Sequence, residues 1–146
     1  MDHNILKYFL ALQLFLVAIK GELFTQEEKV KLKQIHDDCV KETGIDKSVL
    51  LEIIKKKEYP DNEKLKEHLL CSSKKLKFMT EDGNIDKDFI SKTLIAKFKQ
   101  EKIVDDIVKT CAVTKSNLLD TAFEMIKCFH QYAPEELDIL EFFEAN

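Results

Sequence analysis

The four cysteines, Cys39, Cys71, Cys111 and Cys128, constrain the fold of this chain more than any other feature. They are separated by 31, 39 and 16 residues. An even number of cysteines in an exported protein indicates disulfides, and four cysteines allow three different pairings. Buried free thiols are the main alternative. A zinc site is a weaker one, because no two cysteines lie three residues apart, so we expect no metal.

The N-terminal segment favours export and therefore disulfides. The run from Leu6 to Ile19 is almost entirely apolar and too short to cross a bilayer, which needs about 20 residues. Its length and position are typical of a secretory signal peptide. We predict a signal peptide over residues 1–21, with cleavage after Gly21 or, as second choice, after Ala18. The alternatives are an N-terminal core helix and a retained membrane anchor.

The predicted mature domain, residues 22–146, is acidic and contains no arginine. Removing Lys7, Lys20 and Asp2 changes the net charge from −4 to −5, that is 21 basic minus 26 acidic residues. An arginine-free acidic surface argues against nucleic-acid binding, which favours a basic face and bidentate arginine contacts. A second long apolar run does not occur, so we expect no membrane insertion of the mature protein.

Helix signals run through the whole domain, and no convincing alternation of period two occurs. Thr25 and Glu28 form a capping box for a first helix that ends at Gly44. Asp46 caps a helix over residues 47–56, and Asp61 or Asn62 caps the third. In the third helix one apolar stripe follows helical spacing; it consists of Leu65, Leu69, Ser72 and Leu76.

Three further helices follow a chain reversal at Asp82-Gly83. Asp86 caps the fourth, the fifth covers residues 101–111, and Thr114 or Ser116 caps the sixth. These elements give an all-α fold of about six short helices. The C-terminal tail, residues 135–146, is too apolar for a solvated end, and we expect it either to cover a cavity as a lid or to pack on the outer surface.

Catalytic signatures are absent from the sequence. It contains no nucleophile elbow, phosphate loop, dinucleotide loop or zinc-binding pair of histidines. His36, His68 and His130 are interpreted as solvated or hydrogen-bonded side chains rather than ligands or bases. We therefore expect a protein that is not an enzyme and has no cofactor. The surplus of Phe and Met is, by composition alone, an ordinary helical core.

The cysteine spacing, the predicted signal peptide and the six helices resemble the insect odorant-binding protein family, which includes the pheromone-binding proteins. That family usually has six cysteines, with three residues between the second and third and eight between the fifth and sixth. Counting back from Cys71 and Cys128 places the two missing cysteines at Glu67 and Leu119. These two positions pair with each other in the family. The chain therefore resembles its four-cysteine branch, often called C-minus.

The resemblance implies a disulfide pairing, an internal apolar cavity and a set of ligand-binding residues. The implied pairs are Cys39–Cys71 and Cys111–Cys128. Carried over by position, the cavity would be lined by Leu32, Leu69, Ser73, Phe78, Met79, Ile85, Phe89, Leu94, Ile107, Val108, Phe123, Ile126 and Phe129. Ser73, Tyr132 or His130 would orient the ligand by a polar contact.

The function that the resemblance implies is a secreted, extracellular carrier of small apolar or volatile molecules such as odorants or pheromones. Two alternatives stay open: a non-olfactory carrier of haemolymph, reproductive gland or saliva, and a secreted interaction protein without a pocket. The expected partner is a small apolar ligand, with a membrane chemoreceptor as an indirect partner. We expect a monomer or a weak dimer.

Overall fold

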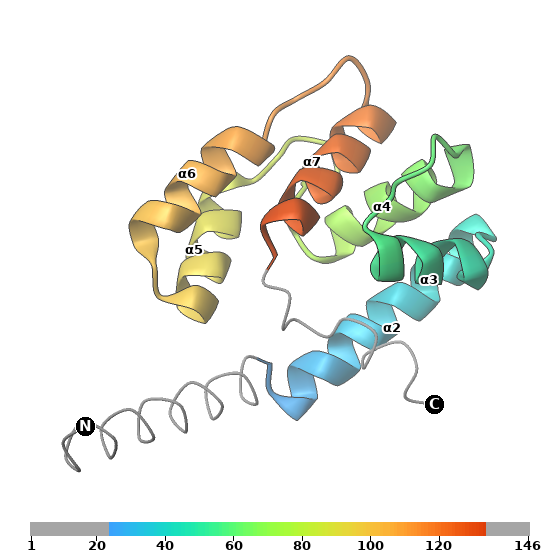
Figure 1. The fold of residues 1–146 in the computed structure, drawn as a ribbon, viewed down its shortest axis with the longest axis horizontal. Coiled ribbons are helices and arrows are strands. Elements are labelled where there is room, and N and C mark those ends of the chain that lie inside the picture. Colours follow the sequence, from blue (N-terminus) through green and yellow to red (C-terminus); the bar gives the residue numbers. More distant parts are fainter. Residues whose placement is uncertain (1–23, 134–146) are drawn as a thin grey trace, which may run out of the picture.

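The computed structural model describes residues 24–133, and within this range the chain forms six α-helices (Figure 1). The predicted signal peptide and the C-terminal tail lie outside the described residues. The helices are α2 (Gln26–Thr43), α3 (Lys47–Lys56), α4 (Glu63–Lys75), α5 (Lys87–Phe98), α6 (Glu101–Cys111) and α7 (Leu118–Tyr132). Across residues 24–133, none of these helices is both long and apolar enough to cross a membrane. The all-α fold class is therefore confirmed.

Most helices begin at the capping residues that the sequence indicates. The Thr25 hydroxyl accepts a hydrogen bond from the Glu28 amide at 3.1 Å, and the Glu28 carboxylate accepts one from the Thr25 amide at 2.9 Å. Asp46, Asn62 and Asp86 cap α3, α4 and α5 in the same way, each with its side chain accepting a backbone N–H. Short polar side chains therefore set the start of each of these helices.

The cap of α7 differs from the prediction. Neither Thr114 nor Ser116 caps the helix; the Asn117 side chain accepts the Asp120 amide at 2.8 Å. The buried Thr121 hydroxyl accepts the Lys115 amide at 2.9 Å and donates to the Asn117 carbonyl at 2.7 Å. These bonds hold residues 115–117 in a loop, so the first helical turn starts one residue later than Ser116 allows.

The helices pack through two apolar clusters, and α7 contributes residues to both. In Figure 1, α7 lies between the α5–α6 pair and the helices α3 and α4. One cluster joins α5, α6 and α7 through residues that include Ile90, Val104, Val108 and Met125. The other joins α3, α4 and α7 through Leu50, Ile53, Leu65, Leu69 and Phe123, together with Ile45. Ile126 of α7 packs against both clusters. The candidate site borders both clusters, and side chains of α2 form another part of its wall.

Two disulfides join the helices, in the pairing that the family resemblance implies. Cys39 of α2 is bonded to Cys71 of α4, and Cys111 of α6 is bonded to Cys128 of α7. Their sequence separations are 32 and 17 residues. The first bond fastens α2 to the second half of α4, and the second fastens α6 to α7.

Candidate functional site: an uncharged cavity

A cavity of about 590 Å³ lies between the two clusters, and all six helices contribute to its wall. Aliphatic and aromatic side chains make up most of the wall. The polar lining residues are His36, Tyr59, His68, Ser72, Gln100, His130 and Tyr132. Within residues 24–133, no Lys, Asp or Glu side chain lines this space. The cavity therefore suits a neutral, mostly apolar molecule, because an unpaired charge would be costly to bury in it.

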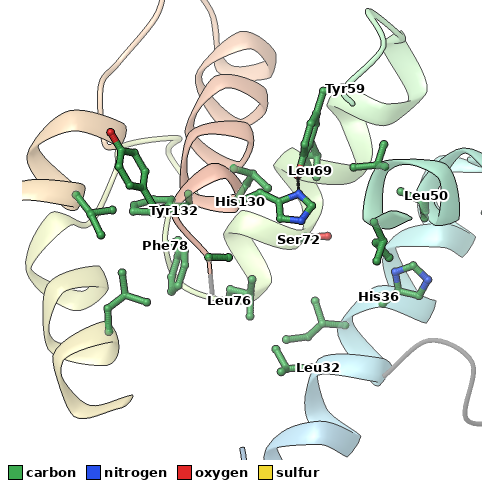
Figure 2. Close-up of a pocket in the computed structure, with 18 of the residues that line it drawn as sticks. Leu32, His36, Leu50, Tyr59, Leu69, Ser72, Leu76, Phe78, His130 and Tyr132 are labelled. Atoms are coloured by element: carbon green, nitrogen blue, oxygen red, sulfur yellow. Dashed lines mark hydrogen bonds between the residues drawn. The ribbon is translucent and has the colours of Figure 1, made fainter. Parts of the chain in front are cut away.

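Seven of the thirteen residues expected from the resemblance line the cavity. They are Leu32, Leu69, Phe78, Leu94, Ile107, Ile126 and Phe129. Figure 2 shows Leu32 on α2 and Phe78 beyond the end of α4 on opposite sides of the space. The structure therefore brings together residues that are up to 97 positions apart in the sequence (129 − 32).

The other six expected residues lie outside the cavity wall. Met79 and Val108 are buried in the α5–α6–α7 cluster, Ile85 packs against that cluster, and Phe123 is buried in the α3–α4–α7 cluster. Phe89 is 36% exposed and contacts Phe78 edge-on, with ring centroids 6.4 Å apart. Ser73 is fully buried next to the core. These side chains hold the fold rather than contact the cavity.

The difference at Ser73 is a matter of helix register. Leu65, Leu69, Ser72 and Leu76, which form the apolar stripe of α4, all line the cavity. One residue turns an α-helix by about 100°, so Ser73 points away from the space that Ser72 faces. The cavity-lining face of α4 is therefore the apolar stripe that helical periodicity indicates, and Ser73 lies one position away from it.

Many of the cavity-lining residues that were not among the thirteen expected from the family resemblance come from α2 and α3. Ile35 and His36 follow Leu32 at helical spacing, and Leu50, Ile53 and Ile54 come from α3. The i, i+3, i+4 spacing from Leu32 is the signal that predicts the α2 residues. For α3 the sequence shows apolar content on one face, but not whether that face meets core or cavity.

Tyr59 and His130 form a polar contact at the cavity wall. The Tyr59 hydroxyl lies 2.6 Å from His130 Nδ1, and the two rings meet edge-on (Figure 2). Burial raises the pKa of Tyr59 above its usual value. Burial, and to a lesser degree the charge of Lys57, lowers the pKa of His130. Both side chains are therefore neutral at pH 7.

A second pair of polar rings, His36 and His68, lies where α2 meets α4. The ring centroids are 5.3 Å apart in an edge-on arrangement. Burial lowers the pKa of His68 to about 4, and the neighbouring His36 adds to this shift. Among the described residues the His68 Nδ1 atom is buried without a hydrogen-bond partner. The same residues contain no group of three or more His, Cys, Asp or Glu side chains that could hold a metal ion.

Comparisons with known proteins match most of the chain. A family model described as the PBP/GOBP family matches residues 22–132. The B1 protein of Tenebrio molitor is 33% identical over 115 residues, which is 79% of this chain and 86% of that protein. The family-model match covers the cavity-forming helices and both disulfides.

Solved structures share the arrangement of the helices. The THP12 carrier protein from the yellow mealworm superposes with a TM-score of 0.55 at 30% identity, covering 67% of this chain and 90% of its own. The fatty acid binding protein OBP56a from the oral disk of the blowfly Phormia regina superposes with a TM-score of 0.60 at 23% identity, covering 74% and 93%. At 23% identity the second likeness supports the fold alone.

Proposed function

The chain belongs to the PBP/GOBP family, the pheromone- and general-odorant-binding proteins of insects, and on that basis we propose that it is a secreted carrier of small apolar or volatile molecules. The observation that carries the proposal is the uncharged cavity of about 590 Å³. This volume lies within the range of about 300–1,000 Å³ in which small-molecule sites are usually found. Its few polar groups can orient a ligand without demanding a charge.

The energetics of such a cavity are adequate for carriage. Each 100 Å² of apolar ligand surface removed from water contributes about 2.5 kcal/mol. Micromolar affinity corresponds to about −8 kcal/mol. A ligand that buries several hundred square ångströms can reach this value after the entropy cost of immobilisation. Family members of this kind bind and carry ligands, so the proposal requires no catalytic group.

Displacement of a fluorescent apolar probe tests the carrier function. We expect the protein to bind the probe at micromolar concentration, and Leu32→Trp to weaken binding at least tenfold by filling the cavity from α2. Val30→Trp on the same helix is the matched control, because Val30 is 60% exposed and lies outside the cavity wall. Absence of probe binding at tens of micromolar would favour the pocketless interaction protein instead.

A non-olfactory role for the same carrier is the second candidate. The yellow mealworm relative at 30% identity is described as a carrier protein, without reference to odour. Ligand extraction from protein purified from its native tissue separates the two roles. A volatile ligand extracted from protein of a chemosensory organ would support olfaction. A non-volatile lipid extracted from protein of another tissue would support general transport.

Secretion is the remaining part of the proposal. The two disulfides, Cys39–Cys71 and Cys111–Cys128, fit an oxidising extracellular compartment. Expression of the full chain in insect cells should give a secreted product whose N-terminal sequence begins at Glu22, or at Ile19 for the second cleavage site. Retention of the intact N-terminus in the cell fraction would contradict the signal peptide.

A further inference from the structure

Tyr59 and His130 come from distant parts of the chain and meet at the cavity wall. Tyr59 lies in the connection between α3 and α4, and His130 lies in the last turn of α7, 71 residues later. The Tyr59 ring also packs edge-on against Phe123, with centroids 5.9 Å apart. These ring contacts fix the tyrosine on one side, so its hydroxyl is held against the histidine.

The surroundings of the Tyr59 hydroxyl indicate which group donates. The hydroxyl lies 2.6 Å from His130 Nδ1, and the described residues offer its proton no other acceptor. A half-buried hydroxyl that accepted from Nδ1 would leave its own proton unpaired, so the hydroxyl donates to the imidazole nitrogen. A neutral imidazole with an accepting Nδ1 carries its proton on Nε2. Tyr59 therefore selects the histidine tautomer.

The Nε2–H group of His130 then remains available to a ligand. The described residues supply it with no hydrogen-bond partner, and it is not among their buried unpartnered polar atoms, so it faces accessible space. The two nitrogens of an imidazole point in divergent directions. In Figure 2 the His130 ring lies between Tyr59, which its dashed bond reaches, and the part of the pocket near Ser72.

We propose that the Nε2–H of His130, oriented by Tyr59, is the donor that selects apolar ligands carrying a neutral carbonyl oxygen, such as ketones, aldehydes and esters. This inference rests on the proposed carrier function and names its ligand class. A hydrocarbon of the same shape leaves the donor unpaired. An ionised carboxylate is disfavoured, because the described cavity wall contains no lysine to compensate its charge.

The test compares three ligands of equal chain length, a methyl ketone, a terminal alkene and a carboxylate, each in competition with the fluorescent probe. For the unmodified protein we expect the ketone to bind about five- to tenfold more tightly than the alkene, as one hydrogen bond allows. His130→Leu should reduce this ratio to about one because it removes the donor, and Tyr59→Phe should reduce it in part because the donor remains but is no longer oriented. The alkene affinity serves as the internal control for the shape of the cavity.

Tyr132→Phe is the matched comparison variant, since it removes the other tyrosine hydroxyl of the wall. If ketone and alkene bound Tyr132→Phe equally well, while Tyr59→Phe kept the full preference for the ketone, the assignment to His130 would be overturned. Equal binding of ketone and alkene by the unmodified protein would also overturn it, while leaving the carrier function in place. Failure to bind the probe at all would instead contradict the carrier function.

A spectroscopic measurement keeps the proposal testable if Tyr59→Phe does not fold. Nitrogen-15 NMR of the unmodified protein distinguishes protonated from unprotonated imidazole nitrogens. We expect His130 to show an unprotonated Nδ1 and a protonated Nε2 at pH 7, and the Nε2–H signal to shift when the ketone binds. A protonated Nδ1 in the free protein would overturn the proposal.

Discussion

Gly83 occupies a left-handed turn position where a side chain would have to displace the tip of the partly exposed Leu118 side chain. Its φ of +87° lies in the left-handed region that favours glycine. A Cβ built there would lie 2.2 Å from Leu118 Cδ2 and 3.0 Å from Leu118 Cδ1, at the start of α7. The turn that precedes α5 is therefore packed directly against α7.

We expect Gly83→Ala to destabilise the protein by about 1–3 kcal/mol, because backbone strain and the collision with Leu118 act together. Chemical denaturation monitored by circular dichroism measures this change. Gly44→Ala is the matched control, since Gly44 also has a positive φ of +69° but no atom within 4 Å of its built Cβ. Gly44→Ala should cost less, and an equal loss in both variants would contradict a packing role for Gly83.

His68 links stability to pH. In the folded protein burial lowers its pKa to about 4, against about 6.5 in the unfolded chain. Above pH 6.5 the residue is neutral in both states and has no effect. As the pH falls from 6.5 to 4 the unfolded chain binds the proton first, so stability decreases. Each unit of pKa difference is worth about 1.4 kcal/mol, which limits the loss to a few kcal/mol.

We therefore expect the free energy of unfolding to decrease between pH 6.5 and 4, and His68→Gln to flatten this decrease. Urea titrations at several pH values give the slope for each protein. His36 and His130, whose pKa values burial also lowers, contribute in the same direction and remain in the variant. An unchanged slope in His68→Gln would show that His68 does not carry the effect.

The start residues of most helices were predicted well from the sequence. Caps at Thr25, Asp46 and Asp86 depend on a short polar side chain that reaches its own backbone, so the information is local. The cap of α7 is different, because the buried Thr121 hydroxyl holds the preceding loop. Such a contact depends on tertiary packing and is not visible in the sequence.

At the scale of the elements, α4 and α7 pack against each other extensively. The family resemblance implies that these two helices lack the third disulfide. The missing cysteines fall on Glu67 in α4 and Leu119 in α7. Directly beside these positions, Lys66 Nζ lies 2.9 Å from Asp120 Oδ1 and also 2.9 Å from Asp61. The lysine side chain is 17% exposed and lies over the Phe123 ring. An ion pair thus links the helices where a covalent bond is absent.

We expect Lys66→Met and Asp120→Asn each to lower Tm by a few degrees. The double variant should lower Tm by less than the sum of the two, because each single change removes the same contact. Asp61→Asn is the matched control, since Asp61 is 89% exposed and its pair with Lys66 is screened by solvent. Scanning calorimetry at low and high salt measures the effect. Strict additivity in the cycle would contradict a direct coupling between α4 and α7.

The cavity was predicted only in part, for a reason that also lies at the element scale. Periodicity identifies the apolar face of α4 but not which neighbours that face meets. Val108 and Ile107 are adjacent in α6, yet Ile107 lines the cavity and Val108 is buried in the core. The choice between core and cavity depends on how helices pack around α7, which single-helix patterns do not encode.

For the molecule as a whole, the two disulfides differ in how strongly the helices they join depend on them. Loop entropy assigns each bond a similar stabilisation of about 3–4 kcal/mol. However, Cys39 is the one residue of α2 that is buried, whereas α6 and α7 share an apolar cluster that includes Val108 and Met125. At its other end α2 contacts α5 through the ion pair of Glu28 and Lys97. The wall that α2 provides therefore depends on the Cys39–Cys71 bond.

We therefore expect Cys39→Ala/Cys71→Ala to weaken ligand binding more than Cys111→Ala/Cys128→Ala, although both double variants lose similar stability. Without its bond, α2 keeps its ion pairs, the packing of Val40 on the α3–α4–α7 cluster and the ring contact of His36 with His68. Apart from Cys39 it has no buried residue, so the wall that Leu32 and Ile35 provide is held less firmly. Without the Cys111–Cys128 bond, α6 remains packed on α7 through Val108 and Met125. Probe affinity at a temperature where both variants are folded, with hydrogen exchange of α2 amides, separates the two effects. Equal losses of affinity would contradict a specific role of α2 in retaining the ligand.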